Sequence, residues 1–157
     1  MLHVESTRTI SADPATVWAA LADYMAIDVI APEVVKVDVL SENSTGLGAK
    51  RRCHFPNGTS LVEEAITWNE GRGYRAAMLD MGKIPFKTAQ AEIRLTPTSD
   101  GKTHVYWCID YQPKFGPLGW LMGATLMKPQ LRKVLNGNLT GLETLVTAPN
   151  TAMPQAS

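Results

Sequence analysis

"GPLGWLMGATLMKPQLRKVLNGNLTGLETLV", residues 116 to 146, is the stretch that decides the fold. From residue 131 onward its apolar side chains recur every three or four positions, as on one face of an α-helix: Leu131, Val134, Leu135, Leu139, Leu142, Leu145 and Val146. At ~1.5 Å per residue the stretch would reach about 45 Å as one helix, long enough to lie across a whole sheet. Pro129 is expected to kink this helix or to divide it into two parts. We therefore predict a long closing helix that covers a sheet and leaves a hollow beneath it.

Three glycines and one asparagine interrupt the apolar pattern of this helix. Gly123, Gly137 and Gly141 each cost about 1 kcal/mol relative to alanine inside a helix. They therefore indicate either a close approach of another backbone or local flexibility. Asn138 lies within the apolar stripe, and a buried amide needs hydrogen-bond partners. It is expected either to be bonded within the core or to face a ligand or water.

The rest of the chain alternates between strand and turn patterns. A predicted strand at residues 3–10 is followed by two short predicted helices, at 11–25 and 27–34. Six more strands are predicted after them, at 34–42, 48–55, 60–68, 73–81, 88–96 and 103–111. The tight turn "PNG" joins the second and third of these six as a hairpin. Strands in succession with a helix at the end indicate an α+β chain with an antiparallel sheet.

Strand alternation assigns side chains to the two faces of this sheet. In the last strand, the better apolar face comprises Val105, Trp107, Ile109 and Tyr111. The opposite, solvated face comprises His104, Tyr106, Cys108 and Asp110. The same alternation turns Cys53 inward and Cys108 outward, so no disulfide is expected between them. By parity with Ile10, Arg8 also points inward.

Composition narrows the possible functions. The chain carries 15 basic and 15 acidic residues, which argues against electrostatic binding of nucleic acid. The first residues show no signal peptide, and the longest apolar run, 117–127, is too short to span a bilayer. The two cysteines form no CxxC pair, so a reduced, cytoplasmic protein is expected. We expect a single domain over residues 1–147 and a flexible C-terminal tail at 148–157.

Several segments, in order, carry a resemblance to a known family: "ISADPATVWAALADY" at 10–24, "GLGAKRRCHFPNG" at 46–58 followed by "LVEEA", "KIP" at 83–85, "THVYW" at 103–107, and the closing stretch. They resemble the SRPBCC superfamily of START-like proteins, closest to its polyketide cyclase/dehydrase-like bacterial members. The resemblance implies a helix-grip fold, in which a seven-stranded antiparallel sheet wraps around the C-terminal helix and two short helices close one end. It also implies a deep cavity for a small or medium hydrophobic ligand, such as a lipid, a polyketide or an aromatic metabolite. Ile30 and Ala31 stand where family members often have an aromatic residue, so this wall of the cavity is expected to be smaller.

Arg51 and Glu63 are the first candidates for polar chemistry inside the cavity. Across the hairpin, Arg51 faces either Glu63 or Glu64, depending on the register of the turn. An inward Arg51 paired with Glu63 either forms a structural ion pair or orients a polar group of a ligand. Arg8 on the first strand has the same two possible roles: it either pairs with an acidic residue or contacts a polar group of the ligand. If the protein is instead a polyketide cyclase or dehydratase, Glu63 would act as the base and Arg51 would stabilise an enolate.

The other candidates for the ligand-binding site are bulky apolar residues and one amide: Met78, Phe86, Trp107, Tyr111, Met127, Leu131 and Asn138. The histidines lack metal-ligand spacing and no nucleotide-binding or hydrolase motif occurs, so no metal and no cofactor are expected. The expected partner is a small hydrophobic molecule, with a homodimer as a second possibility. A further alternative is a protein-interaction domain of the chaperone-activator kind. In that case the apolar stretch at 117–127 would be exposed and could dock on a membrane or a second copy.

Overall fold

The computed structural model describes residues 1–148, so the tail expected at 148–157 lies, apart from Ala148, outside the described residues. The elements follow in the order β1 (Leu2–Ile10), α1 (Pro14–Ala22), η1 (Tyr24–Val29), β2 (Lys36–Val39), β3 (Lys50–His54), β4 (Ser60–Asn69), β5 (Gly73–Leu79), β6 (Phe86–Pro97), β7 (Thr103–Pro113), α2 (Gly116–Met122), η2 (Gly123–Met127) and α3 (Lys128–Thr147). This is the predicted order of one strand, two short helices, six strands and a closing helix.

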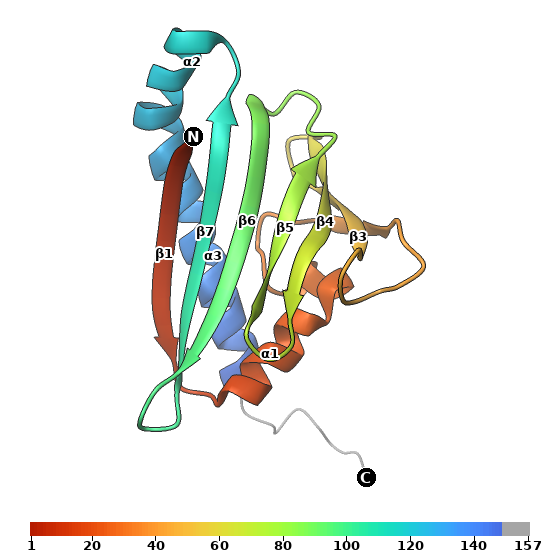
Figure 1. Cartoon of the computed structure of the whole chain (residues 1–157), viewed down its shortest axis with the longest axis vertical. Coiled ribbons are helices and arrows are strands. Elements are labelled where there is room, and N and C mark those ends of the chain that lie inside the picture. Colours follow the sequence, from red (N-terminus) through yellow and green to blue (C-terminus); the bar gives the residue numbers. More distant parts are fainter. Residues whose placement is uncertain (149–157) are drawn as a thin grey trace.

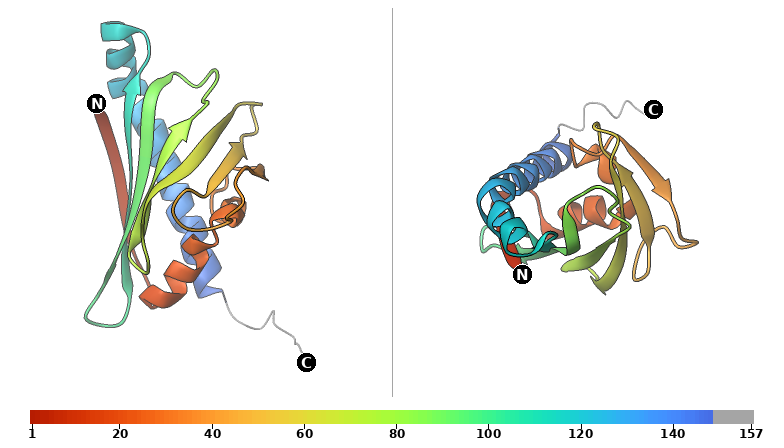
Figure 2. Two further views of the ribbon diagram at one scale, coloured as in Figure 1. Left: turned by 45° about the vertical axis from the view of Figure 1, so that its right-hand side comes forward. Right: turned by 90° about the horizontal axis from the view of Figure 1, so that it is seen from above.

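The seven strands form one sheet in the order β1-β7-β6-β5-β4-β3-β2, and every neighbouring pair is antiparallel (Figure 1). The sheet curves, and α3 runs along its concave side while α1 crosses one end (Figure 2). A β-bulge between Ala65 and Thr67 of β4 contributes to this curvature, because a bulge bends its strand. The predicted α+β helix-grip fold is therefore confirmed.

The closing helix continues through three segments with a wider, π-helical turn in the middle. This turn, η2, ends at Met127, two residues before Pro129. The helix is thus divided into a part that ends at Met127 and a part that begins at Lys128, which confirms the division expected from Pro129. Proline has no N–H to donate and its ring crowds the carbonyl four residues earlier, so a wider turn just before it relieves the crowding.

The second half of the closing helix is packed tightly against the rest of the protein. Leu135, Leu139 and Leu142 of α3 are completely buried. Gly141 permits this contact, because a Cβ at that position would lie 1.8 Å from the carbonyl oxygen of Ile30, just after η1. At Gly137, by contrast, a Cβ would meet nothing nearer than Pro32 at 3.7 Å. Close backbone approach therefore explains Gly141 but not Gly137.

An aromatic cluster seals the end of the molecule where α1 and η1 lie. The rings of Trp68 and Tyr74 stack with centroids 5.2 Å apart, and Trp18 and Tyr24 meet them edge-on. The Nε1 of Trp18 also donates to Glu70 over 2.6 Å. This cluster forms a rigid floor below the concave face of the sheet.

The outer face of the sheet departs from expectation at one residue. Cys108 lies on that face as predicted, but it is only 2% exposed. Its neighbours across the sheet are Glu5 of β1 and Glu92 of β6, two longer side chains that flank the small thiol. The prediction of a uniformly solvated face is wrong for this position. Both cysteines are free and lie on opposite faces.

The two glycines of α3 give a matched test of the packing. Gly141→Ala is expected to lower the free energy of unfolding by about 2–3 kcal/mol, because its methyl group meets backbone that must move. Gly137→Ala is expected to raise it by about 0.5–1 kcal/mol, because alanine favours the helix and the site is open. Urea unfolding of both variants measures the difference, and equal effects would contradict the close contact at Gly141.

Candidate functional site

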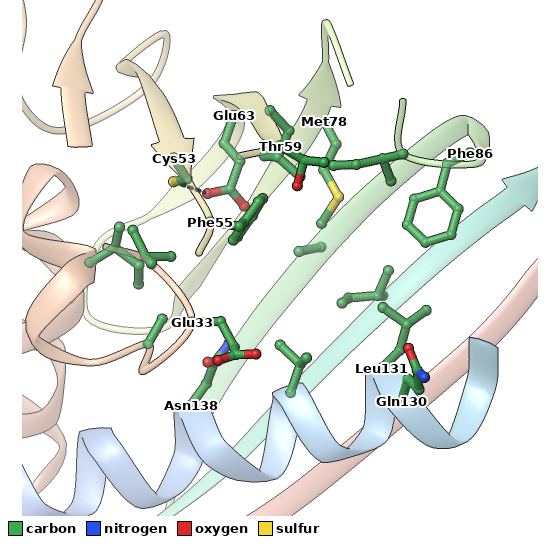
Figure 3. A pocket seen from close by; sticks show the side chains of 18 of the residues that line it. Glu33, Cys53, Phe55, Thr59, Glu63, Met78, Phe86, Gln130, Leu131 and Asn138 are labelled. Atoms are coloured by element: carbon green, nitrogen blue, oxygen red, sulfur yellow. Dashed lines mark hydrogen bonds between the residues drawn. The ribbon is translucent and has the colours of Figure 1, made fainter. Parts of the chain in front are cut away.

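A cavity of about 420 Å³ lies between the concave face of the sheet and α3. Most of its wall is apolar and comes from β3 to β7, the loop before β6 and the first turns of α3, including Leu61, Met78, Ile84, Phe86, Ala91, Trp107, Ile109, Met127, Leu131 and Val134. Figure 3 shows Met78 and Phe86 projecting from the strands on one side of the cavity and Leu131 from α3 on the other. The exposed residues Glu33, Asn57 and Gln130 also line it, so the cavity reaches the surface.

Arg51 and Glu63 form a buried ion pair in the cavity wall. The strands β3 and β4 adopt the register that sets Arg51 opposite Glu63, which settles the alternative that the sequence left open. The Nε and Nη2 of Arg51 donate to the same oxygen, Oε2 of Glu63, over 2.9 and 2.7 Å. The Nη1 of Arg51 donates to the carbonyl of Tyr24, and the guanidinium lies 3.7 Å from the centre of the Tyr24 ring.

The surroundings hold Arg51 in its charged form. Burial by itself favours the neutral form, but the Glu63 carboxylate and the nearby tyrosines act in the opposite direction, and the net pKa of Arg51 is raised. The thiol of Cys53 donates to the same Glu63 oxygen over 3.5 Å. Burial, followed by the Glu63 charge, raises the pKa of this thiol well above its ordinary value. Cys53 is therefore a neutral donor to Glu63.

Two oxygen acceptors in the cavity wall have no hydrogen-bond donor among residues 1–148. One is Oε1 of Glu63, because Arg51 and Cys53 all engage the other carboxylate oxygen. The second is Oδ1 of Asn138, which is buried without a partner. Of the two roles that the sequence allowed for Asn138, a fully bonded core amide is thus wrong. Glu63 and Asn138 project toward the cavity from β4 and α3, on opposite sides (Figure 3).

Eight of the ten residues predicted for the site line the cavity: Arg51, Glu63, Met78, Phe86, Trp107, Met127, Leu131 and Asn138. Arg8 and Tyr111 do not, and their prediction as cavity residues is corrected here. Both face inward as their strand parity predicted, but α3 and η2 cover them. Arg8 donates to Thr140 over 2.7 Å and to Glu143 over 3.2 Å, and the Tyr111 hydroxyl donates to the Gly123 carbonyl over 2.6 Å.

Some cavity residues were missed from the sequence. Cys53, Ala91 and Ile109 share strand faces with predicted inward residues, so parity could have found them. Glu33 and Asn57 lie in loops, where no periodic signal marks the side that faces the cavity.

A second group of chemically interesting side chains lies on the outer face of the sheet. The ligand atoms of His3, Cys108 and Asp110 lie within 4.8 Å of one another. Both ring nitrogens of His3 are engaged, Nδ1 with Asp110 over 2.6 Å and Nε2 with Glu5 over 2.8 Å. Hydrogen bonds to Asp110 and then Glu5 raise the pKa of His3, which favours the protonated ring that cannot bind a metal. The hydrogen bond between His3 and Asp110 therefore joins β1 to β7.

Comparison with known proteins assigns the chain to a family. The profile of the family described as "Polyketide cyclase / dehydrase and lipid transport" matches residues 1–147. The chain belongs to this family. It is the family that the resemblance in the sequence had indicated, within the SRPBCC superfamily.

Solved structures share the fold of this polyketide cyclase/dehydrase and lipid transport protein at low sequence identity. A protein from Thermus thermophilus is 20% identical with a TM-score of 0.77, over 94% of this chain and 98% of its own. The Zhui aromatase/cyclase from Streptomyces sp. R1128 is 21% identical with a TM-score of 0.71, over 94% and 96%. The protein XoxI from Bacillus cereus is 16% identical with a TM-score of 0.77, over 94% and 97%. No curated protein matches the chain in sequence.

Within residues 1–148, no helix of this family member is long and apolar enough to cross a membrane.

Removing the carboxylate of the buried pair tests its structural role. Glu63→Ala is expected to lower the free energy of unfolding by about 3–5 kcal/mol, because it leaves the charge of Arg51 buried without its partner. The neighbouring Glu64 lies 3.9 Å from Lys50 in a half-exposed pair, so Glu64→Ala should cost less than about 1 kcal/mol. Urea unfolding compares the two, and a small loss for Glu63→Ala would contradict a buried, dependent Arg51.

The hydrogen bonds of His3 to Asp110 and Glu5 predict that the stability of the protein depends on pH. Because its native pKa is raised above 6.5, its contribution is complete below that pH and is lost as pH rises through the native pKa. The stability advantage of the wild type over His3→Asn should therefore shrink as the pH rises from about 6 into the mildly alkaline range. Thermal unfolding of both proteins across this range measures it. A difference that does not change with pH would exclude protonation of His3 as its source.

Proposed function

We propose that this protein binds a small or medium, largely apolar molecule that carries a hydrogen-bond donor. The observation that supports it most is the cavity of about 420 Å³ with an apolar wall and two acceptors that lack donors. Its volume falls within the range of small-molecule sites, about 300–1,000 Å³. Family membership is consistent with this proposal, since the family's description includes lipid transport.

Desolvation of the ligand would supply most of the affinity. Each square ångström of apolar surface removed from water contributes about 25 cal/mol. Met78 and Met127 suit a wall that adapts to different shapes, because their side chains are unbranched and polarisable. The aromatic rings of Phe86 and Trp107 offer flat surfaces for an aromatic or polyketide ligand.

The polar side of the cavity selects the functional group of the ligand. Arg51 directs its donors at Glu63 and at the Tyr24 carbonyl, so it supports Glu63 rather than binding a ligand carboxylate. Oε1 of Glu63 and Oδ1 of Asn138 can accept hydrogen bonds. A hydroxyl, phenol or amide N–H therefore fits, whereas a ligand carboxylate would meet the Glu63 charge and leave both acceptors without a donor.

A polyketide cyclase or dehydratase is the second candidate, and one observation favours it. The Glu63 oxygen that Arg51 leaves free could take a proton from a substrate bound in the cavity. The Zhui protein, named an aromatase/cyclase, has this fold. The expected second role of Arg51, stabilising an enolate, is not supported, because its donors are directed at Glu63 and Tyr24.

A matched pair of aromatic probes tests the proposed binding. 1-Naphthol should bind at least about 10-fold more tightly than 1-naphthoate, which differs in carrying a carboxylate, and Glu63→Gln should narrow this gap. Ala91→Phe fills the cavity and should weaken naphthol binding at least about 10-fold. The matched control is Ala77→Phe on β5, because Ala77 is absent from the cavity lining and lies next to the outward-facing Gln90. Quenching of Trp107 fluorescence and calorimetry measure the dissociation constants.

The outcomes separate the parts of this proposal. If neither probe binds, the apolar binding function is contradicted. If naphthoate binds as tightly as naphthol, the role of the acceptors is contradicted while the cavity stands. If Ala77→Phe and Ala91→Phe weaken binding equally, the probe binds elsewhere.

A further inference from the structure

The segment between β7 and α3 exposes a run of large apolar side chains. Six of them, here called the α2–η2 patch, are between 47% and 76% exposed: Phe115, Leu118, Trp120, Leu121, Met122 and Leu126. Figure 1 shows α2 at one end of the molecule, beyond the end of β7. Single exposed apolar residues are common, but a continuous cluster of this kind marks an interaction surface. The patch therefore needs an occupant.

The α2–η2 patch lies beside the mouth of the cavity. Met127 at the end of η2 and Leu131 in the next turn line the cavity wall. At the start of the patch, Lys114 bonds to the loop before β6, with its N–H to the Pro85 carbonyl and its Nζ to the Gly82 carbonyl, both over 3.1 Å. That loop contributes Ile84 to the cavity wall. The patch, the loop and the mouth thus form one continuous rim.

This rim is basic although the whole chain has no net charge. No aspartate or glutamate occurs in residues 81–91 or 111–142, whereas these two stretches contain Lys83, Lys87, Lys114, Lys128, Arg132 and Lys133. Within residues 1–148, none of these six basic groups has a carboxylate partner within 4.0 Å. The nearest acid before the loop, Asp80, is already paired with Arg52 over 2.5 Å. Against these six basic groups stands the exposed carboxylate of Glu33, which also lines the cavity, so the rim keeps a net positive charge.

From this combination we infer that the α2–η2 patch binds the surface of an anionic lipid bilayer. Apolar side chains flanked by lysine and arginine are the pattern of segments that lie in a membrane interface. Anionic headgroups would neutralise the basic rim while the apolar side chains enter the acyl boundary. A second copy of this chain fits less well, because a two-fold contact through the patch would bring together two rims that each carry a net positive charge.

Docking in this way would turn the mouth of the cavity toward the bilayer. An apolar ligand could then pass between lipid and cavity without crossing water. This consequence rests on the proposed function, whereas membrane binding itself does not.

Sedimentation with lipid vesicles tests the inference. The full chain should bind vesicles of phosphatidylcholine and phosphatidylglycerol at least about 10-fold more strongly than phosphatidylcholine alone, and salt should weaken this binding. The triple variant Leu118→Ser/Leu121→Ser/Leu126→Ser should lose at least about 10-fold in binding to the anionic vesicles. The wild type should also show a blue shift of tryptophan emission that Trp120→Phe removes.

A triple serine variant elsewhere on the surface provides the control. Val29, Val35 and Val39 are each 58% exposed, lie outside the patch, and are changed to serine together. This control variant should bind anionic vesicles like the wild type. Circular dichroism and thermal unfolding confirm that both triple variants fold.

Several results would overturn the inference. They are absence of wild-type binding to anionic vesicles, equal binding by the patch variant, or a dimer in gel filtration that the patch substitutions abolish. Naphthol binding by the patch variant, measured without vesicles, keeps the two proposals apart. If vesicle binding fails while naphthol binds, only the membrane surface is contradicted, and the reverse result contradicts only the ligand proposal.

Discussion

The close contact between Gly141 and the carbonyl of Ile30 fixes where the closing helix can touch the rest of the protein. Without a side chain at this position, α3 comes within van der Waals distance of the backbone after η1, and Leu139 and Leu142 on either side of it are completely buried. The same helix is straight, while the sheet beneath it curves away. The closing helix is held against β1, where Arg8 bonds to Thr140, and against β7, where Tyr111 bonds to Gly123, while the curved sheet carries β3 to β5 away from it. The cavity is therefore a geometric consequence of the packing, and its wall is formed where side chains from the two layers do not meet.

The buried ion pair acts on both the fold and the chemistry of the cavity. Arg51 joins β3 and β4 to the turn at Tyr24, so the strands that carry Glu63 are tied to the end that α1 closes. Because its donors are directed at Glu63 and at the Tyr24 carbonyl, the guanidinium stabilises a carboxylate whose other oxygen faces the cavity. Together the two side chains carry no net charge. The group that they offer to a ligand is the free carboxylate oxygen of Glu63, which is a hydrogen-bond acceptor. Arg51, which the sequence suggests as a cation that binds the ligand, thus stabilises the Glu63 carboxylate instead.

Much of this architecture could be predicted from the sequence because strand and helix periodicity directly report which face of an element is buried. Parity correctly turned Arg51, Trp107 and Tyr111 inward. Parity does not report how far along a strand the helix makes contact, which is why Arg8 and Tyr111 lie under the helix rather than in the cavity. Glu33 falls within the short helix predicted at 27–34, but η1 ends at Val29 and Glu33 lies in the turn after it, where no periodicity marks the side that faces the cavity. The π-helical form of the turn before Pro129 was not predicted either, since a proline indicates that a helix is disturbed but not which kind of turn accommodates it.

The pairing of β1 with β7 has a consequence for how the chain acquires this fold. Leu2 lies opposite Tyr111 and Ile10 opposite Thr103, so among the described residues the first strand pairs with β7 alone, which is the last strand to be synthesised. Such long-range pairing gives a high contact order and slow closure, because a long loop must be ordered before the contact forms. During synthesis on the ribosome, β1 has no strand to pair with until β7 has emerged. The apolar residues Val4 and Ile10 of β1 stay unpaired until then, and the sheet is complete only when almost all of the chain has been made.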